Sequence, residues 1–281
     1  EALHSNSKLL IITADRPERL RKTGSNQTTN QVGIYSLIKT HDLATSIQIK
    51  PLLNGGPVHL NVQFDEPLLS NVKDSWLSGI KVTPAEYKNN VTGKLEVTTG
   101  VLVIGHDRAG YEVSEVNEFA SKLNWPVIAE DPISFPQAIA HTPLFLSDEK
   151  IREKLAPESI IVIGRTTLSR STNNFIQLAN KVIVIDPRIS SIDDKRQADL
   201  LLTNLPSEVT SSSSDTNIWQ KILELAASQI KEIKWSEQLA AITICKLLPN
   251  DSALFVGSSR PVRDIEAFAA PRSGVDVFAN R

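Results

Sequence analysis

The sequence predicts an α/β protein in which one complete, doubly wound parallel-sheet central domain is flanked by partial α/β domains. Between residues 98 and 206, short runs rich in valine and isoleucine alternate with segments of helical length. These runs, such as Val101–Ile104 and Ile160–Ile163, contain no alternating polar residues. Strands that are buried on both faces of a parallel sheet have this pattern. Two further strand-like runs before the region and two after it indicate the end of one α/β unit and the start of another.

The first part of the chain predicts two strands joined by a helix. Residues 9–13 form an apolar, strand-like run that ends at Ala14-Asp15-Arg16-Pro17. Residues 34–48 have mixed apolar spacing that suits a helix. The turn sequence Asn54-Gly55-Gly56-Pro57 then leads into a second strand at 58–62. The proline-containing stretch 65–97 has weak periodicity and indicates a connector.

The central region predicts six strands and their crossover helices. Residues 113–123 and 174–180 are the expected crossover helices. The expected strands are 101–104, 126–129, 143–146, 160–163, 182–185 and 200–202.

The last part of the chain begins with a run of serines, Ser211–Ser214, which predicts a flexible linker. Helical periodicity follows over 217–246, and then a strand over 253–256. A helix is expected from the segment after Gly257 through Ala270, and a last strand at 275–279. The expected domains are therefore 1–75 and 98–206, a linker at 76–97, and a linker with the start of a third domain at 207–281.

Composition excludes several functional classes. With a formal net charge of −2, the chain has no global basic field to indicate nucleic acid as a partner. A single cysteine, Cys245, cannot form an internal disulfide, which favours a cytoplasmic location. No apolar run approaches the roughly 20 residues that a membrane span needs. Because the chain has no methionine and stops at Arg281 directly after a strand-like run, we expect an internal piece of a longer protein.

The motif search yields no complete catalytic set and no metal site. Gly105-His-Asp-Arg-Ala-Gly110 follows a buried strand, where a nucleotide phosphate could meet a helix, but an ordinary turn is the favoured interpretation. Asp186-Pro187-Arg188 is interpreted in the same way, since no glycine-rich loop accompanies it. The five histidines are scattered without metal-ligand spacing.

Arginines instead stand where ligands of α/β proteins bind. Arg16 and Arg281 follow predicted strands, and Arg263 falls in the first turns of a predicted helix. Ligands of doubly wound sheets bind at the carboxyl ends of the strands, and arginine grips carboxylates with two parallel hydrogen bonds. Each arginine taken alone is more simply a solvated surface residue, but their shared placement indicates a small polyanionic substrate. Further polar candidates are Asn26, Gln27 and Ser259.

Four ordered blocks of the sequence carry a family resemblance. The first is Thr13-Ala-Asp-Arg-Pro17 followed by Gly24-Ser-Asn-Gln-Thr28, and the second is Gly56-Pro-Val-His-Leu-Asn61. The third is Gly257-Ser-Ser-Arg-Pro-Val-Arg-Asp264, and the fourth is Asn280-Arg281. These blocks resemble those of the MenD family, the 2-succinyl-5-enolpyruvyl-6-hydroxy-3-cyclohexene-1-carboxylate synthases. The central domain matches mainly in its strand pattern and in Gly164–Arg170.

The resemblance implies a transferase that decarboxylates 2-oxoglutarate on thiamine diphosphate and adds the succinyl carbanion equivalent to isochorismate. A divalent metal, usually Mg²⁺, holds the diphosphate in the family. Both substrates are dicarboxylates, which agrees with the independent interpretation of the arginines. The three-domain architecture of thiamine-diphosphate enzymes is also implied.

The family's site residues map onto this chain in two groups. The matches to Arg16, Asn26 and Gln27 face isochorismate. The matches to Ser259 and Arg263 hold the distal carboxylate of the succinyl group, and the match to Arg281 lines the substrate pocket. Arg170 matches a basic residue of the central domain at the same cleft.

Two family features have no match in these 281 residues. The glutamate that activates the cofactor is expected upstream of Glu1, and the metal- and diphosphate-binding motif beyond Arg281. We therefore expect no catalytic or metal residue here and no activity from this chain alone, and a homodimer or homotetramer for the intact enzyme.

Two alternatives remain open. One is another thiamine-diphosphate enzyme, such as an acetohydroxyacid synthase or a 2-oxoacid decarboxylase, which acts on monocarboxylates. The other is a regulatory or structural module without catalytic activity.

Overall fold

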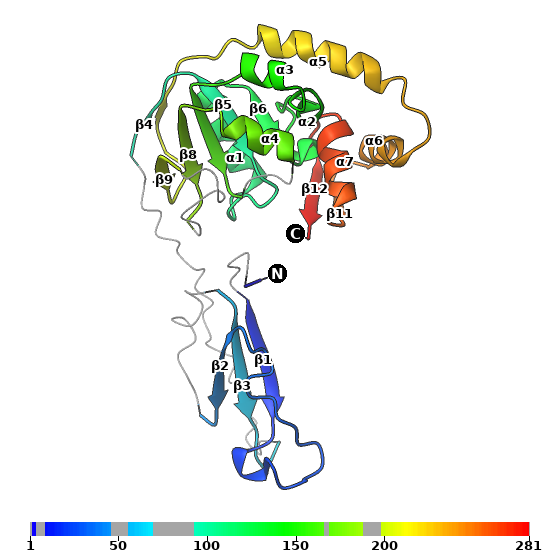
Figure 1. Ribbon diagram of the computed structural model, residues 1–281. Coiled ribbons are helices and arrows are strands. Elements are labelled where there is room, and N and C mark those ends of the chain that lie inside the picture. Colours follow the sequence, from blue (N-terminus) through cyan, green and yellow to red (C-terminus); the bar gives the residue numbers. More distant parts are fainter. Residues whose placement is uncertain are drawn as a thin grey trace. The chain divides into compact units, whose positions relative to one another are not determined.

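The computed structural model describes residues 2–3, 9–45, 56–69, 93–165, 169–187 and 198–280. The chain divides into two compact units, Glu1–Glu86 and Tyr87–Arg281 (Figure 1). All strand pairs of both units are parallel within the described residues. The predicted α/β class with parallel sheets is therefore confirmed. In these ranges no helix is both long enough and apolar enough to cross a membrane.

The first unit is a three-stranded sheet in the order β1-β3-β2. Its strands are β1 (Leu10–Asp15), β2 (Lys39–Leu43) and β3 (Val58–Gln63), and a short 3-10 helix, η1 (Glu18–Leu20), follows β1. The helix predicted over residues 34–48 is wrong at β2, where pairing with β3 satisfies the backbone of an irregularly patterned segment.

The central sheet of the second unit has five strands in the order β6-β5-β7-β8-β9. They are β5 (Gly100–Ile104), β6 (Val127–Ala129), β7 (Ser159–Ile163), β8 (Lys181–Ile185) and β9 (Leu200–Leu202). Every residue of β5, β6 and β7 is buried, as their unalternated sequences predict.

Successive side chains of these strands point into two separate apolar cores. Leu102 and Ile104 pack in the core that includes α1 (Val113–Leu123). Val101 and Val103 pack in the other core, with α4 (Arg170–Ile176) and Trp219 of α5 (Asn217–Ile230). Because strand side chains alternate in direction, each core covers one face of the sheet.

Two segments of the central region differ from the prediction. Residues 143–146, expected as a strand, lie largely in a short helix, α2 (Thr142–Phe145), followed by α3 (Glu149–Lys154). A short apolar run does not distinguish a strand from a buried helix, and Pro143 suits the first turn of a helix. The crossover helix expected at 174–180 is α4, which begins earlier because the Ser169 hydroxyl caps it by accepting from the Thr172 N–H at 3.3 Å.

The serine run is not a free linker. Strand β10 (Val209–Thr210) ends directly before it and pairs with β4 (Leu95–Glu96). The Ser211 hydroxyl donates to the Leu123 carbonyl at 2.9 Å, and the Ser214 hydroxyl donates to the Gly100 carbonyl at 2.9 Å. The prediction of a flexible segment is therefore wrong at these serines, because their hydroxyls bind backbone groups of the central sheet.

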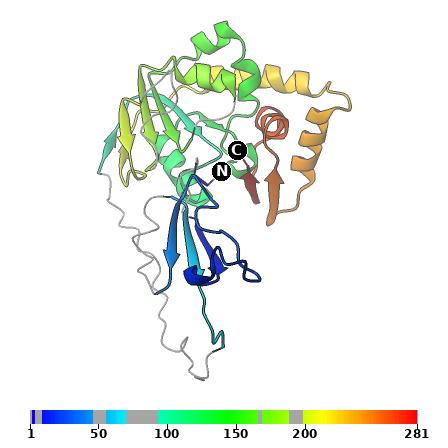
Figure 2. The same ribbon diagram turned by 60° about the horizontal axis from the view of Figure 1, so that its bottom comes forward.

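The last part of the second compact unit forms a smaller α/β arrangement, which we call the C-terminal unit. The helical region expected at 217–246 is two helices, α5 and α6 (Glu237–Leu247), separated at Ser236, whose hydroxyl caps α6. Strands β11 (Ser252–Val256) and β12 (Val275–Ala279) are joined through α7 (Arg260–Phe268). Figure 2 shows α6 and α7 on one side of this strand pair. The short 3-10 helix η3 (Pro132–Ser134) of the central region contributes Ile133 to the core of this unit.

Candidate functional site

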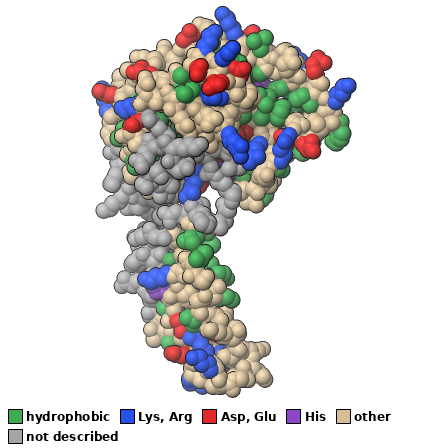
Figure 3. Space-filling view, viewed as in Figure 1, with side chains coloured by type: hydrophobic (Ala, Val, Ile, Leu, Met, Phe, Trp, Pro, Cys, Tyr) green, Lys and Arg blue, Asp and Glu red, His purple; other side chains and the backbone are tan. Residues whose placement is uncertain are grey.

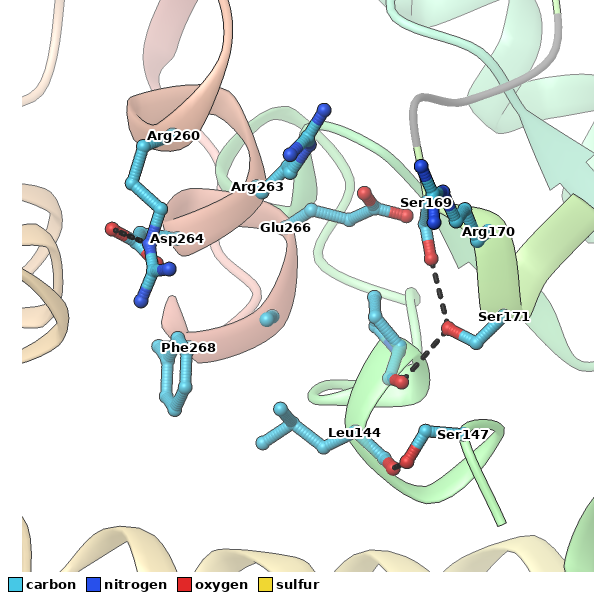
Figure 4. Close-up of a pocket in the computed structure, with 12 residues that line it drawn as sticks. Leu144, Ser147, Ser169, Arg170, Ser171, Arg260, Arg263, Asp264, Glu266 and Phe268 are labelled. Atoms are coloured by element: carbon cyan, nitrogen blue, oxygen red, sulfur yellow. Dashed lines mark hydrogen bonds and ion pairs between the residues drawn. The ribbon is translucent and has the colours of Figure 1, made fainter.

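A pocket of about 670 Å³ lies between α7 and the start of α4. In the space-filling view, basic side chains gather over α7 (Figure 3). Figure 4 shows the lining residues, with α7 on one side and the α2–α4 region on the other. Its charged lining residues are Arg170, Arg260, Arg263, Asp264 and Glu266.

Local capping places Arg170 at this pocket. Arg170 is the first residue of α4 and is exposed. The Ser169 and Ser171 hydroxyls lie 2.9 Å apart, and Ser171 donates to the Pro143 carbonyl at 2.9 Å. These hydrogen bonds fix the first turn of α4 against α2, so the guanidinium group projects from an anchored backbone.

The amphipathic sequence of α7 places Arg263 opposite. Val262 and Ile265 are buried in the core of the C-terminal unit, whereas Arg263 is exposed. Residues three apart share a helix face, so Glu266 stands beside Arg263. Glu266 is only 2% exposed, and its Oε1 accepts from the Thr172 hydroxyl at 3.4 Å. One helix therefore presents both an arginine and a buried carboxylate to the pocket.

A histidine also connects α7 to α2. The His141 Nδ1 atom lies 2.9 Å from the Ala267 carbonyl oxygen. Burial lowers the pKa of His141, so the neutral ring with a proton on Nδ1 donates this hydrogen bond. The side of α7 that lines the pocket is thus fixed to the central region.

The arginines of the pocket differ in their ion pairing. Arg260 pairs with Asp264, with Nε 2.9 Å from Oδ1. Among the described residues, Arg170 and Arg263 form no ion pair within 4.0 Å. Two guanidinium groups are therefore available to an anionic ligand, and each supplies a planar pair of donors that suits a carboxylate.

Ser259, the other expected residue of the second unit that the structure describes, lies near the β11–β12 pair. Ser259 precedes α7 in a left-handed backbone conformation, with φ 74°, and is exposed. The Asn280 Oδ1 atom accepts from the Ser258 N–H at 2.9 Å, which joins the carboxyl ends of the two strands. The structure thus places Arg170 and Arg263 at one pocket, with Ser259 at the start of α7, while Arg281 lies outside the described residues.

The first unit brings two of its three expected residues together. The Arg16 Nη2 donates to the Gln27 Oε1 at 3.2 Å on the surface that follows β1. Gln31 supports the same segment, because its Nε2 donates to the Ala14 carbonyl at 2.9 Å. Asn26 is exposed beside Gln27. A guanidinium and two amides therefore lie in one short surface region.

A polar network beneath this region was not predicted. The Arg21 guanidinium donates to both carboxylate oxygens of Asp42, at 2.7 and 2.9 Å, and to Asp15 at 2.9 Å. Asn61 donates to both acids, at 2.8 and 2.9 Å. Burial opposes ionisation of Asp15, but hydrogen bonds led by that from Asn61 bring its pKa below the ordinary value. Hydrogen bonds from Arg21 lower the pKa of Asp42. The polar residues inside these strands were the available sequence signal.

The two glycine-containing turns of the central sheet pack directly against each other. A Cβ atom on Gly105 would lie 1.6 Å from the Arg165 carbonyl oxygen. Gly164 has φ +72°, and a Cβ there would lie 1.8 Å from the Asp107 carbonyl oxygen. Glycine is required by this close approach. The geometry favours ordinary strand-end turns here over a phosphate-binding loop.

A buried acidic pair follows β6. Glu130 accepts from the His106 N–H at 2.8 Å, and Asp131 accepts from the Ser134 N–H at 3.0 Å. Burial raises the pKa of Asp131 to about 7, even though Arg108 lies 3.5 Å from its carboxylate. Neither acid belongs to a metal cluster, since the described ranges contain no group of three or more histidine, cysteine or acidic side chains arranged to hold a metal. These residues therefore do not fit a site for Mg²⁺ and a diphosphate.

Comparisons with known proteins identify the family of the chain. A sequence profile of the family described as "Middle domain of thiamine pyrophosphate" matches residues 70–256, which is more than half of the chain. The chain belongs to this family. The match to this middle-domain family includes the whole central sheet, both turns at its carboxyl edge, and α4 with Arg170.

Curated relatives extend the similarity over the whole chain. A protein from Lysinibacillus sphaericus is 29% identical over 345 residues, covering 100% of this chain and 58% of the relative. A protein from Nocardioides is 30% identical over 312 residues, covering 100% of this chain and 55% of the relative. Both are named 2-succinyl-5-enolpyruvyl-6-hydroxy-3-cyclohexene-1-carboxylate synthase. The resemblance to MenD enzymes is confirmed, and the chain spans a little over half the length of these relatives.

Proposed function

We propose that the protein containing this chain is a thiamine-diphosphate-dependent 2-succinyl-5-enolpyruvyl-6-hydroxy-3-cyclohexene-1-carboxylate synthase. It removes CO₂ from 2-oxoglutarate and joins the remaining succinyl unit to isochorismate. The main support is the shared name of relatives that align with the whole chain. The pocket agrees with a dicarboxylate substrate, because two of its arginines form no ion pair with the residues that the structure describes. When bound, thiamine diphosphate supplies the electron sink for the decarboxylation, and Mg²⁺ holds its diphosphate.

Arg170 and Arg263 bind the distal carboxylate of 2-oxoglutarate in this proposal. They approach one pocket from α4 and α7, and each offers a planar pair of N–H donors. A carboxylate gripped from two sides is held in one orientation, which fixes the position of the oxoacid carbon that reacts. Ser259 and Arg281 are proposed to line the same substrate site.

Arg16, Asn26 and Gln27 bind isochorismate in this proposal. Arg16 and Gln27 lie within hydrogen-bond distance of each other, and Asn26 is exposed beside them. Arg21, which follows η1, donates to Asp15 at the end of β1 and to Asp42 in β2. These hydrogen bonds fix both ends of the short segment that carries Arg16. These residues select and orient an acceptor with two carboxylates.

The further assignments complete the proposal. The central sheet is the doubly wound middle domain of the thiamine-diphosphate architecture, and the intact enzyme is a cytoplasmic homodimer or homotetramer. A monocarboxylate-specific enzyme of the same class is the competing assignment. It is less well supported, since a monocarboxylate leaves no distal group for the arginine pair.

Initial rates of the full-length protein distinguish the two assignments. The assay supplies thiamine diphosphate, Mg²⁺ and isochorismate with either 2-oxoglutarate or pyruvate. We expect turnover with 2-oxoglutarate and a value of kcat/KM for pyruvate lower by at least about 100-fold, because pyruvate lacks the second carboxylate. Equal or faster turnover of pyruvate would overturn the assignment to this synthase.

A further inference from the structure

Asn61 is a fully buried amide on β3, which lies between β1 and β2 in the sheet of the first unit (Figure 1). The register of the sheet places it beside Thr13 of β1 and Asp42 of β2. Side chains of a strand alternate between the two faces, so Asp15, two residues after Thr13, lies on the same face. One face of this sheet therefore carries polar side chains from all three strands.

The Asn61 amide joins two carboxylates that come from the strands on either side. Its Nδ2 donates to Asp15 Oδ2 at 2.8 Å and to Asp42 Oδ1 at 2.9 Å. Burial opposes ionisation of Asp15, but hydrogen bonds led by that from Asn61 lower its pKa. Hydrogen bonds led by that from Arg21 lower the pKa of Asp42. Both acids are therefore charged at neutral pH, and both accept from the same amide group.

A chain of hydrogen bonds fixes the orientation of this amide. Because ionised carboxylates only accept, the NH₂ group faces them, and the Asn61 Oδ1 accepts from the Thr13 hydroxyl at 2.9 Å. The Thr13 hydroxyl has no second proton, so the His59 Nε2, 2.8 Å away, donates to it. The neutral His59 ring then accepts at Nδ1 from the Thr40 hydroxyl at 3.1 Å. Asn61 therefore cannot turn over without breaking hydrogen bonds on both sides.

Asp15 connects this amide to Arg16. While Asp15 Oδ2 accepts from Asn61, its Oδ1 accepts from the backbone N–H of Arg16 at 2.7 Å. The Arg16 side chain in turn donates to Gln27 Oε1 at 3.2 Å. Rotation of the Asp15 carboxylate would break its hydrogen bond to the Arg16 backbone. Asn61 thus acts on Arg16 through a single intermediate residue.

We propose that Asn61 is a positioning residue for Arg16, because it holds the Asp15 carboxylate in the orientation that fixes the backbone of Arg16. This inference rests on the proposed function, since it assigns Asn61 to the isochorismate side of the substrate site. Arg21 also donates to Asp15, at 2.9 Å, so the charge of Asp15 remains paired when Asn61 is replaced. The expected consequence of losing the amide is a misplaced Arg16, not an unpaired buried charge.

The experiment is a double-mutant cycle in the full-length holoenzyme, with isochorismate and 2-oxoglutarate varied in turn. We expect Asn61→Ala to lower kcat/KM for isochorismate by about tenfold and to leave the KM for 2-oxoglutarate within about twofold. In an Arg16→Ala background, the same substitution should change kcat/KM for isochorismate by less than about twofold, because the group that Asn61 positions is gone. A residue that only supports the fold would give the same loss in both backgrounds.

Thr40→Val is the matched control on the same polar face. It removes the hydrogen bond to the far ring nitrogen of His59 but leaves the bond between Thr13 and Asn61 in place. We expect both kcat/KM values to stay within about twofold of wild type. If Asn61→Ala does not fold, Thr13→Val replaces it in the cycle, because valine keeps the shape of threonine but leaves the amide oxygen without its donor. The loss should again fall on isochorismate and disappear in the Arg16→Ala background.

Equal losses in the two backgrounds, or a loss that falls equally on both substrates, would overturn the inference. Failure of the proposed function gives a different result, which is no turnover of isochorismate by the wild-type holoenzyme. In that case, deuterium exchange of the Arg16 backbone amide makes the test without turnover. We expect exchange to be about tenfold faster in Asn61→Ala and unchanged in Thr40→Val. Equal exchange rates in wild type and Asn61→Ala would then contradict the inference.

Discussion

Arg263→Ala is the substitution that most directly tests the carboxylate pocket. Arg263 is exposed on α7, forms no ion pair with the described residues, and lines the pocket opposite Arg170. Truncating one partner of a buried charge pair costs about 2–5 kcal/mol. Because Arg170 remains to hold the carboxylate, we expect the lower part of this range, about 2–3 kcal/mol, which is roughly a 30- to 150-fold loss in kcat/KM.

The assay is steady-state kinetics of the full-length enzyme with each substrate varied in turn. The loss should fall on 2-oxoglutarate and leave the KM for isochorismate near its wild-type value. Arg263→Lys should recover only part of the activity, since an ammonium group lacks the planar pair of donors.

Arg260→Ala is the matched control on the same helix. Arg260 is neutralised by Asp264, and Figure 4 shows the pair on the side of α7 away from Arg170. We expect this variant, made together with Asp264→Asn so that no buried carboxylate is left without its cation, to stay within about threefold of wild type. Equal kinetics for Arg263→Ala and this control would remove Arg263 from the substrate site.

Three further predictions concern stability and reactivity. Arg21→Met should destabilise the first unit by about 2–4 kcal/mol, because it leaves Asp15 buried without its cation. Faster deuterium exchange of the backbone amides in β1 and β3 measures this loss. The control is Arg19→Met, which removes an exposed ion pair and should leave the exchange rates unchanged. Because the pKa of Asp131 is raised from 3.8 to about 7, the folded state binds its proton more tightly than the unfolded state. Its contribution to stability is full below the ordinary pKa and falls by at most about 1.4 kcal/mol per pH unit until pH about 7. Asp131→Asn should flatten this fall in urea unfolding between pH 5 and about 7, and an unaltered slope would contradict it. Burial raises the pKa of Cys245 to about 11, so iodoacetamide should alkylate it at least about 100-fold more slowly in the native protein than after denaturation; similar rates would refute this.

The fold was predictable where one local pattern has one structural outcome. The unalternated runs of β5, β7 and β8 required burial on both faces, and the last strand was predicted at the residues of β12. Prediction failed where tertiary contacts decide the structure. The apolar run at 143–146 suits a strand or a buried helix equally, and the serines at 211–214 are held by backbone groups that are distant in the sequence.

The site was predictable only in part for the same reason. The placement of Arg263 at the start of a helix followed from the sequence, and Arg170 came from the family resemblance. The three-residue spacing to Glu266 was visible in the sequence, but the hydrogen bond from Thr172 depends on how α4 and α7 pack. The Arg21–Asp42 pair likewise joins a turn to a strand whose assignment was wrong.

Product formation by the full-length protein tests the central claim most directly. The purified enzyme is given thiamine diphosphate, Mg²⁺, isochorismate and 2-oxoglutarate labelled with ¹³C at the carboxyl group next to the ketone. Mass spectrometry then follows labelled CO₂ and the organic product. We expect one labelled CO₂ for each molecule of 2-succinyl-5-enolpyruvyl-6-hydroxy-3-cyclohexene-1-carboxylate formed. Release of CO₂ at the same rate without isochorismate, with no joined product, would contradict the account.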